Sequence, residues 1–161
     1  MIRPAEEKDL PELRRVYTAA RQYMIRSGNP DQWADGYPAQ EVLDNDLKLG
    51  HRLYVIEENG IIHGVFAFIL GEDPTYSYIE GQWINSLPYG TIHRIASDGR
   101  FKGVAKAAFE WAYDNHDLDL RVDTHELNIT MQNCLKNFGF SYCGIIYVDD
   151  GTPRMAYQKE K

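Results

Sequence analysis

The sequence predicts an α/β fold with a single mixed, mostly antiparallel central sheet flanked by helices. Two observations support this fold class. Asn59-Gly60 separates two apolar runs, as in a tight β-hairpin, so antiparallel strands are expected on either side of this pair. Later, the stretch "IHRIASDGRFKGVAKAAFEWAYDN" (residues 92–115) changes from strand spacing to helix spacing, and another strand follows. A helical crossover of this kind joins two parallel neighbours.

The remaining elements follow from apolar spacing and from helix-end signals. Asp9 and Glu12 form a capping-box pattern that opens a helix running toward Gly28, and a second helix covers residues 38–49 and ends at Gly50. Strands are expected over residues 2–5, 52–58, 61–70, 76–83, 91–97, 120–125, 140–148 and 154–159, and further helices over residues 103–116 and 129–138. The chain of 161 residues suits one domain, residues 1–161.

Charge and motif content exclude several classes of protein. The formal net charge is -7, so no basic face is expected for nucleic acid or for an anionic membrane. The longest apolar run, residues 65–70, is too short to span a bilayer, and the N-terminus lacks a signal-peptide pattern. No CxxC pair and no HExxH motif occurs, so no metal is expected. These observations predict a cytoplasmic protein.

The loop over residues 98–103 is the main candidate for ligand binding. It contains two glycines and two basic residues, and it lies between a strand and a helix whose first amides lack internal partners. Its spacing fits neither GxxxxGK[ST] nor GxGxxG. From the residues alone, a phosphate-binding loop and an ordinary basic turn both remain open.

The sequence resembles the GCN5-related N-acetyltransferases, the GNAT family. R-x-x-G-x-A, at Arg100, Gly103 and Ala105, is similar to that family's pyrophosphate-loop pattern, Q/R-x-x-G-x-G/A. "MIRPAEEKDLPEL", "LYVIEENGIIHGVFAF" and "DTHELNITMQNCLKNFGF" fall where the family has its opening strand and helix, its hairpin, and its last strand–helix unit. The resemblance covers essentially the whole chain and implies a GNAT-like acyl-CoA N-acyltransferase fold.

The resemblance implies a reaction and a donor. The expected activity is transfer of an acetyl group from acetyl-CoA to a primary amine of a small molecule or peptide, by direct attack. The residues expected to contact the cofactor are Ile95, Ala96, Ser97, Arg100, Phe101, Lys102, Gly103, Val104, Ala105, Lys106 and Asn128. Asn128 is also a good helix N-cap, and the two roles are compatible.

The acid–base residues stay open. A base is needed because only a neutral amine attacks, and the candidates are His93, His125, Glu126 and Glu80. His93 is expected to share a strand face with Ile95, two residues later. The family's usual acid, a tyrosine seven residues after the asparagine, is replaced by Leu135, so the general acid is unknown. The loop is also two residues shorter than usual, with Gly99 available for a tighter turn.

Trp33, Tyr37 and Trp83 are candidates for the acceptor site, because aromatic rings can house a cationic amine. Trp33 and Tyr37 can equally well anchor a long loop to the core. A monomer or homodimer is expected, with residues 143–148 and 154–159 as a possible dimer edge. The alternative to an enzyme is a CoA-binding protein of this fold with a sensing, regulatory or interaction role, which the missing tyrosine favours.

Overall fold

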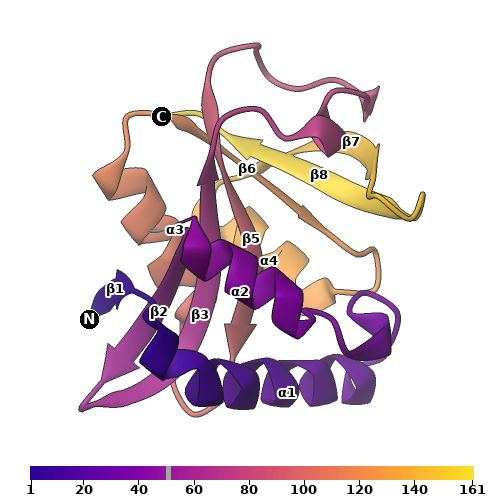
Figure 1. Cartoon of the computed structure of the whole chain (residues 1–161). Coiled ribbons are helices and arrows are strands. Elements are labelled where there is room, and N and C mark those ends of the chain that lie inside the picture. Colours follow the sequence, from indigo (N-terminus) through magenta and orange to yellow (C-terminus); the bar gives the residue numbers. More distant parts are fainter. Residues whose placement is uncertain (50–51) are drawn as a thin grey trace. The chain divides into compact units, whose positions relative to one another are not determined.

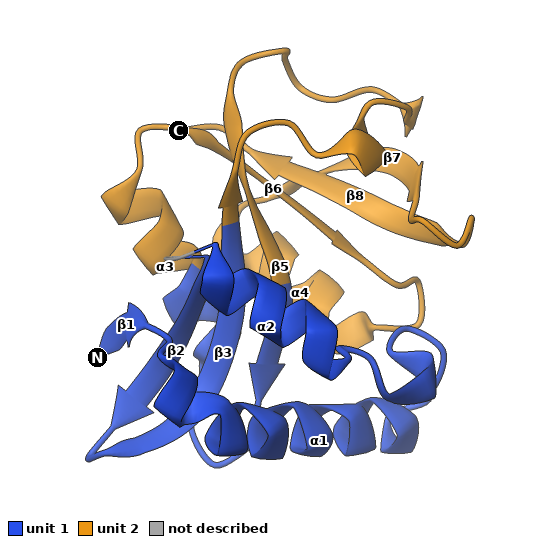
Figure 2. Ribbon diagram, in the orientation of Figure 1, with its two compact units in different colours: residues 1–68, 94–108 blue, residues 69–93, 109–161 orange. Residues whose placement is uncertain are grey.

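The computed structural model describes residues 1–49 and 52–161 (Figure 1), and Gly50, the expected helix end, lies outside these ranges. The described strands form one eight-stranded sheet in the order β1-β2-β3-β5-β6-β8-β7-β4. The chain groups into two compact units, Met1–Phe68 with Arg94–Ala108, and Ile69–His93 with Phe109–Lys161 (Figure 2). β5 (Tyr89–Ser97) and α3 (Val104–Asn115) each contribute residues to both units.

The first unit packs two helices against a hairpin. It contains β1 (Ile2–Pro4), η1 (Glu7–Asp9), α1 (Leu10–Arg26), η2 (Ala34–Gly36), α2 (Gln40–Lys48), β2 (Leu53–Glu58) and most of β3 (Ile61–Leu70). β2 pairs antiparallel with β1 and β3. The hydrophobic core of the first unit joins α1 and α2 to β2 and β3. It includes Leu13, Val16, Tyr17, Leu43, Val55, Val65 and Ala67. Apolar residues at helical spacing on α1 therefore meet alternate residues of the strands.

The second unit carries the rest of the sheet. It contains η3 (Pro74–Tyr76), β4 (Glu80–Gly81), β6 (Asp119–Thr124), α4 (Ile129–Phe138), β7 (Ser141–Tyr147) and β8 (Pro153–Lys159). β5 pairs parallel with β6, as the crossover predicts, and β8 pairs antiparallel with β6 and β7. Phe109 of α3 contacts the rings of Phe138 and Phe140, with centroids 5.4 and 5.2 Å away.

Local signals give most element bounds correctly. The Asn59-Gly60 turn has φ angles of 51° and 76°, the left-handed conformation that two-residue hairpin loops require. α4 covers the expected residues and ends at Gly139, with a φ of 100°. Asp9 takes the expected N-cap position of the first helix, but its side chain does not cap that helix. It also ends η1, and its Oδ2 accepts a hydrogen bond from the N–H of Glu6 at 2.8 Å, so the capping box with Glu12 is wrong.

Two expectations about strands are wrong. Residues 76–83 do not form a continuous strand, because η3 ends at Tyr76 and β4 has only two residues. The expected dimer edge also fails in part, since β8 lies between β6 and β7, and β7 itself pairs with β4 at Ile145 and Gly144.

None of the helices in the described ranges has both the length and the apolar stretch needed to cross a membrane.

Candidate functional site

The loop between β5 and α3 is a tight turn shaped by two glycines. Gly99 and Gly103 have φ angles of 79° and 86°, a region that side chains with a Cβ rarely adopt. The N–H of Gly99 donates to Ser97 Oγ at 3.1 Å, and the N–H of Arg100 donates to Asp98 Oδ1 at 2.9 Å. Gly99 thus allows the short connection that the sequence indicates.

The start of α3 has the features of an anion site. In the first turn of the helix the N–H of Ala107 donates to Gly103 O at 2.9 Å. The leading amides of a helix, such as that of Val104, point out of its start rather than to a carbonyl within it. The helix dipole favours negative charge at this end. Arg100 and Lys102 are exposed, as is Lys106. The residues available to an anionic ligand here are therefore basic side chains and backbone amides.

Gly64 of β3 explains how α3 can begin so close to the sheet. A Cβ at Gly64 would lie 2.7 Å from Val104 Cγ1, well inside contact distance. The glycine therefore makes room for the first residue of the helix. Because side chains alternate along a strand, Val104 packs on the face of β3 opposite to Val65, which belongs to the α1 core.

Asp98 begins the loop and its side chain is 1% exposed. Burial raises the pKa of this carboxyl, but hydrogen bonds from Arg100 N–H, Arg15 and His63 outweigh burial and hold the pKa at about 2. Asp98 is therefore ionised at neutral pH. No local sequence pattern reveals the pairing of Asp98 with His63 and Arg15, because these residues come from distant segments.

The strand before the loop is irregular at Arg94, whose φ is 51°. Its guanidinium forms an ion pair with Asp46 of α2 at 2.6 Å, and its carbonyl accepts a hydrogen bond from Tyr17 Oη at 3.1 Å. Strand alternation does not hold across Arg94, so the expectation that His93 and Ile95 share a face loses its basis. Ile95 is half-buried and Ala96 is buried in the core of the first unit.

His93 lies in a cluster of polar side chains within the second unit. Its Nε2 is 2.8 Å from Asp73 Oδ2, and its Nδ1 is 3.8 Å from Asp123 Oδ2. Tyr76 Oη donates to Asp123 Oδ2 at 2.6 Å, and Tyr89 Oη accepts from Asp73 N–H at 2.8 Å. Burial raises the pKa of Asp73, but hydrogen bonds from His93 and Thr75 bring it down to about 2.

The other candidate bases have different surroundings. His125 Nδ1 accepts from Leu127 N–H at 3.1 Å. The Glu126 side chain is exposed, and Glu80, also exposed, accepts from Tyr147 Oη at 2.8 Å. His93, by comparison, is paired with the partly buried Asp73 carboxylate.

Asn128 is the N-cap of α4, and its Oδ1 accepts from Met131 N–H at 3.0 Å. Leu135, where the resembling family has a tyrosine, is fully buried. Burial raises the pKa of the neighbouring Cys134 thiol, which disfavours its ionisation.

The aromatic candidates for the acceptor site pack against their own units. The Trp33 ring lies 5.6 Å from Tyr17 and 6.3 Å from Tyr37, centroid to centroid, so these rings anchor the loop after α1. The Trp83 Nε1 donates to Tyr76 O at 3.0 Å. The buried Arg121 guanidinium lies 4.0 Å from the ring centroids of both Trp83 and Tyr89. The packing explanation of these tryptophans therefore has direct support.

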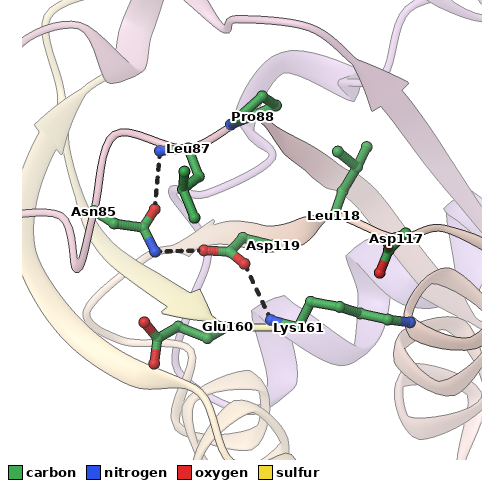
Figure 3. A pocket seen from close by; sticks show the side chains of 8 residues that line it. All are labelled: Asn85, Leu87, Pro88, Asp117, Leu118, Asp119, Glu160 and Lys161. Atoms are coloured by element: carbon green, nitrogen blue, oxygen red, sulfur yellow. Dashed lines mark hydrogen bonds between the residues drawn. The ribbon is translucent and has the colours of Figure 1, made fainter.

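A pocket of about 470 Å³ lies elsewhere in the second unit (Figure 3). It is lined by Asn85, Leu87, Pro88, Asp117, Leu118, Asp119, Glu160 and Lys161. Asp119 accepts hydrogen bonds from Asn85 Nδ2, Gln158 Nε2 and Lys161 N–H at 2.8, 2.9 and 3.0 Å. None of the site residues expected from the sequence lines this pocket. Within residues 1–49 and 52–161, no three His, Cys, Asp or Glu side chains are placed to hold a metal ion.

Comparison with known proteins finds relatives among solved structures. No family model matches the chain, and no curated protein matches it. A GNAT-family acetyltransferase from Streptococcus agalactiae 2603 is 34% identical, with 100% of this chain and 95% of that chain covered and a TM-score of 0.91. A GNAT-family acetyltransferase from Listeria monocytogenes 4b F2365 is 20% identical, with coverage of 100% and 94% and a TM-score of 0.71.

A plant protein has the same fold. Arabidopsis thaliana Naa50, in complex with the bisubstrate analogue CoA-Ac-MVNAL, is 13% identical, with coverage of 100% and 98% and a TM-score of 0.65. At these identities the Listeria and Arabidopsis proteins are evidence for the fold alone. The streptococcal protein is similar in sequence as well, along essentially the whole chain.

Proposed function

The chain belongs to the GNAT family of acetyltransferases, and from this premise we propose that it transfers the acetyl group of acetyl-CoA to a primary amine by direct attack. The acceptor is a small molecule or a peptide. The observation that carries the proposal is the glycine-bounded loop before α3, which presents exposed basic side chains next in sequence to the first amides of a helix.

The phosphates of CoA are proposed to bind at this loop. The positive end of α3 offers the backbone amides of Gly103, Val104 and Ala105. Charged donors come from the side chains of Arg100 and Lys102. Lys106 and Phe101 complete the set expected from the family pattern. Backbone groups of Ile95, Ala96 and Ser97, together with Asn128, are proposed to bind the pantetheine arm. The Arabidopsis complex with a CoA-containing analogue supports acetyl-CoA as the donor.

His93 is proposed as the general base. The ionised Asp73 carboxylate accepts a hydrogen bond, so it favours the tautomer with a proton on His93 Nε2. Nδ1 is then the basic nitrogen. The Asp123 carboxylate lies beside this nitrogen, with Oδ2 3.8 Å from Nδ1.

The proposed step balances without a further reactant. The amine nitrogen bonds to the thioester carbonyl carbon, the carbon–sulfur bond breaks, and the sulfur leaves with its electron pair as CoA thiolate. The proton lost by the amine goes to His93 Nδ1. Because Leu135 cannot donate a proton, no protein group is assigned as the general acid, and the thiolate is proposed to leave unprotonated.

The acceptor is proposed to be an amine that is cationic in solution. The His93 cluster brings together the carboxylates of Asp73 and Asp123, which attract such a group. A peptide amine is one candidate, since the Arabidopsis complex holds an analogue that includes the peptide MVNAL. Trp33, Tyr37 and Trp83 stay candidates for the acceptor site, although their packing assigns them a structural role as well.

Release of free thiol from acetyl-CoA, measured over a panel of amines, tests the proposed function. The panel includes polyamines, amino acids, aminoglycosides and short peptides with free N-termini. We expect at least one amine to give saturable, enzyme-dependent thiol release, with the acetylated product confirmed by mass spectrometry. Binding of acetyl-CoA without release for any amine would instead favour a CoA-binding protein with a sensing role.

A further inference from the structure

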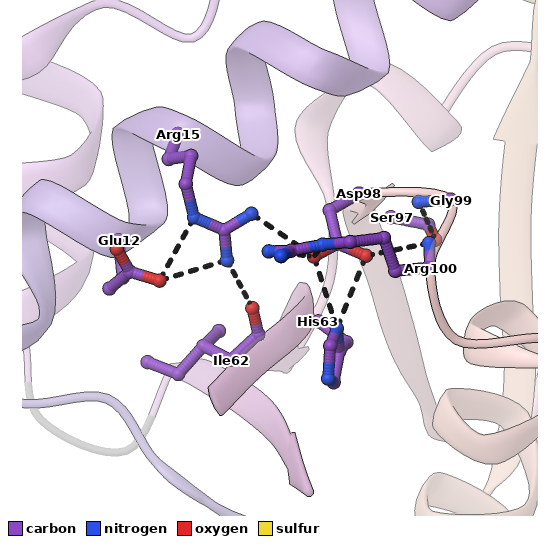
Figure 4. Close-up of polar contacts among 8 residues, drawn as sticks. All are labelled: Glu12, Arg15, Ile62, His63, Ser97, Asp98, Gly99 and Arg100. Atoms are coloured by element: carbon purple, nitrogen blue, oxygen red, sulfur yellow. Dashed lines mark hydrogen bonds and ion pairs between the residues drawn. The ribbon is translucent and has the colours of Figure 1, made fainter. Parts of the chain in front are cut away.

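Asp98 is the meeting point of three positively charged or ionisable side chains from separate segments (Figure 4). Its Oδ2 lies 3.0 Å from Arg15 Nη1, 3.1 Å from His63 Nδ1 and 2.8 Å from Arg100 Nη2. With a side chain that is 1% exposed, this carboxylate needs such partners to remain charged. The cluster lies entirely within the first unit.

The same residue also fixes the backbone of the loop. Its Oδ1 accepts from the N–H of Arg100 at 2.9 Å, which closes a turn over Gly99. Its own N–H donates to His63 O at 3.0 Å and ties the beginning of the loop to β3. Asp98 therefore controls both the course of the loop and the direction of the Arg100 side chain.

The three partners differ in how firmly they are held. Arg15 also donates to Glu12 Oε2 at 2.9 Å and to Ile62 O at 2.6 Å, so α1 and β3 fix it independently of the loop. His63 is 12% exposed, and its ring stacks on Phe101 with centroids 6.1 Å apart. The Arg100 side chain is 56% exposed, and an ion pair with so exposed a group contributes little stability.

We infer that Asp98 is a positioning residue for the phosphate groups of the donor. It shapes the short loop and holds the Arg100 guanidinium at the loop that precedes α3. When a phosphate arrives, Arg100 transfers from Asp98 to the phosphate, while Arg15 and His63 continue to neutralise Asp98. This inference rests on the proposed function, because it takes the phosphates of acetyl-CoA as the ligand of the loop.

The test compares two donors on the full chain by titration calorimetry. One is acetyl-CoA, and the other is S-acetylpantetheine, which lacks every phosphate and is measured by displacement of acetyl-CoA. Asp98→Asn keeps an oxygen for the Arg100 amide but removes the charge. Arg15→Met removes a partner that does not belong to the loop. Asp150→Asn is the matched control, since Asp150 Oδ1 accepts from Thr152 N–H at 2.9 Å in a similar turn between β7 and β8.

We expect Asp98→Asn to raise the Kd of acetyl-CoA about tenfold, the equivalent of one lost hydrogen bond to a charged group. Arg15→Met shifts this Kd in the same direction. In both variants the Kd of S-acetylpantetheine stays within about twofold of wild type, because the phosphates are absent. Asp150→Asn changes neither Kd.

Two results would overturn the inference while the proposed function stands. One is an unchanged Kd of acetyl-CoA in both Asp98→Asn and Arg15→Met. The other is an equal weakening of both donors, which indicates a general structural effect. Partial unfolding would raise the apparent Kd of both donors by the same factor, so it does not imitate the expected difference between them. A wild-type protein that binds no acetyl-CoA would contradict the proposed function itself.

Discussion

His93 and Asp73 are the residues on which the proposed chemistry depends most. Replacing His93 with Gln removes the base but retains a polar side chain, and we expect kcat/KM to fall about 100-fold, the range for a lost general base. Asp73→Asn should also lower kcat/KM, because the hydrogen bond that selects the His93 tautomer changes. The Kd of acetyl-CoA should stay unchanged in both. Steady-state kinetics as a function of pH provides the measurement.

Glu80→Gln and Glu126→Gln serve as the comparison for the base. Both carboxylates were candidates from the sequence, and both are exposed in the structure. We expect their pH–rate profiles to match that of wild type. If the basic limb of the pH–rate profile disappears in Glu126→Gln and remains in His93→Gln, Glu126 and not His93 is the general base.

Arg94 and Asp46 form a buried ion pair that the sequence does not reveal. Asp46 is 3% exposed, and the Arg94 side chain is 13% exposed. Asp46→Asn leaves a buried cation without its counter-charge and should lower the free energy of unfolding by about 3 kcal/mol. Asp44→Asn, on the same helix but less buried, should change it by less than about 0.5 kcal/mol. Urea denaturation checks both, and equal effects would contradict the assigned role of the pair.

Contacts that stay within a few residues could be predicted at the residue level. Asn128 is an N-cap, because the helix signal and its cap lie side by side in the chain. The role of Asp73 could not be predicted, because it binds His93, which lies 20 residues later. Such a pairing depends on the sheet bringing two segments together, and no local pattern records it.

Among the elements, helices and the hairpin follow from the sequence because their signals are local. Examples are the bounds of α4 and the turn at Asn59-Gly60. The expected strand over residues 76–83 fails for the opposite reason. Its pairing partner is β7, far along the chain, and Asp73 caps η3 by accepting from Thr75 N–H at 2.9 Å. The local turn therefore takes the first residue of that range, and the strand is limited to Glu80 and Gly81.

Gly64 joins strand β3 to the start of α3, and a substitution there tests that packing. Gly64→Ala places a methyl group 2.7 Å from Val104 Cγ1. We expect a loss of about 1–3 kcal/mol in the free energy of unfolding, the usual cost of an overpacked site. Val104→Ala in the same chain should restore part of that loss, because the two groups compete for one space. If the loss in the double variant equals the sum of the losses in the two single variants, the packing of Gly64 against Val104 is contradicted.

At the level of the whole molecule, stability should fall in acid. The folded-state pKa values of Asp73 and Asp98 are about 2, below the ordinary value of 3.8. Their ionised forms therefore stabilise the fold above the ordinary value, and this contribution is lost as the pH falls toward the folded-state values. Urea denaturation from neutral pH down to about pH 3 measures the loss. Asp98→Asn should flatten the pH dependence, and an unchanged slope would contradict the role given to Asp98.

The fold class and the family could be predicted from the sequence, because several weak motifs occur in a fixed order along the chain. The expectation of one domain over residues 1–161 stays a prediction, since the contacts divide the chain into two compact units. The acceptor could not be predicted, because the aromatic side chains proposed for it have packing roles as well.

The central claim is that the loop before α3 binds the phosphates of acetyl-CoA, and thermal melting tests it most directly. At about 1 mM acetyl-CoA and a Kd a hundredfold lower, binding adds about 2.7 kcal/mol to stability, so the melting temperature should rise by about 5 °C or more. Gly103→Asp should abolish the rise, because a carboxylate at this loop repels phosphate. Gly151→Asp is the matched control, with a φ of 82° and open space around its Cβ, and should keep the rise. No shift in the wild-type protein, or the same shift in Gly103→Asp, would contradict the claim.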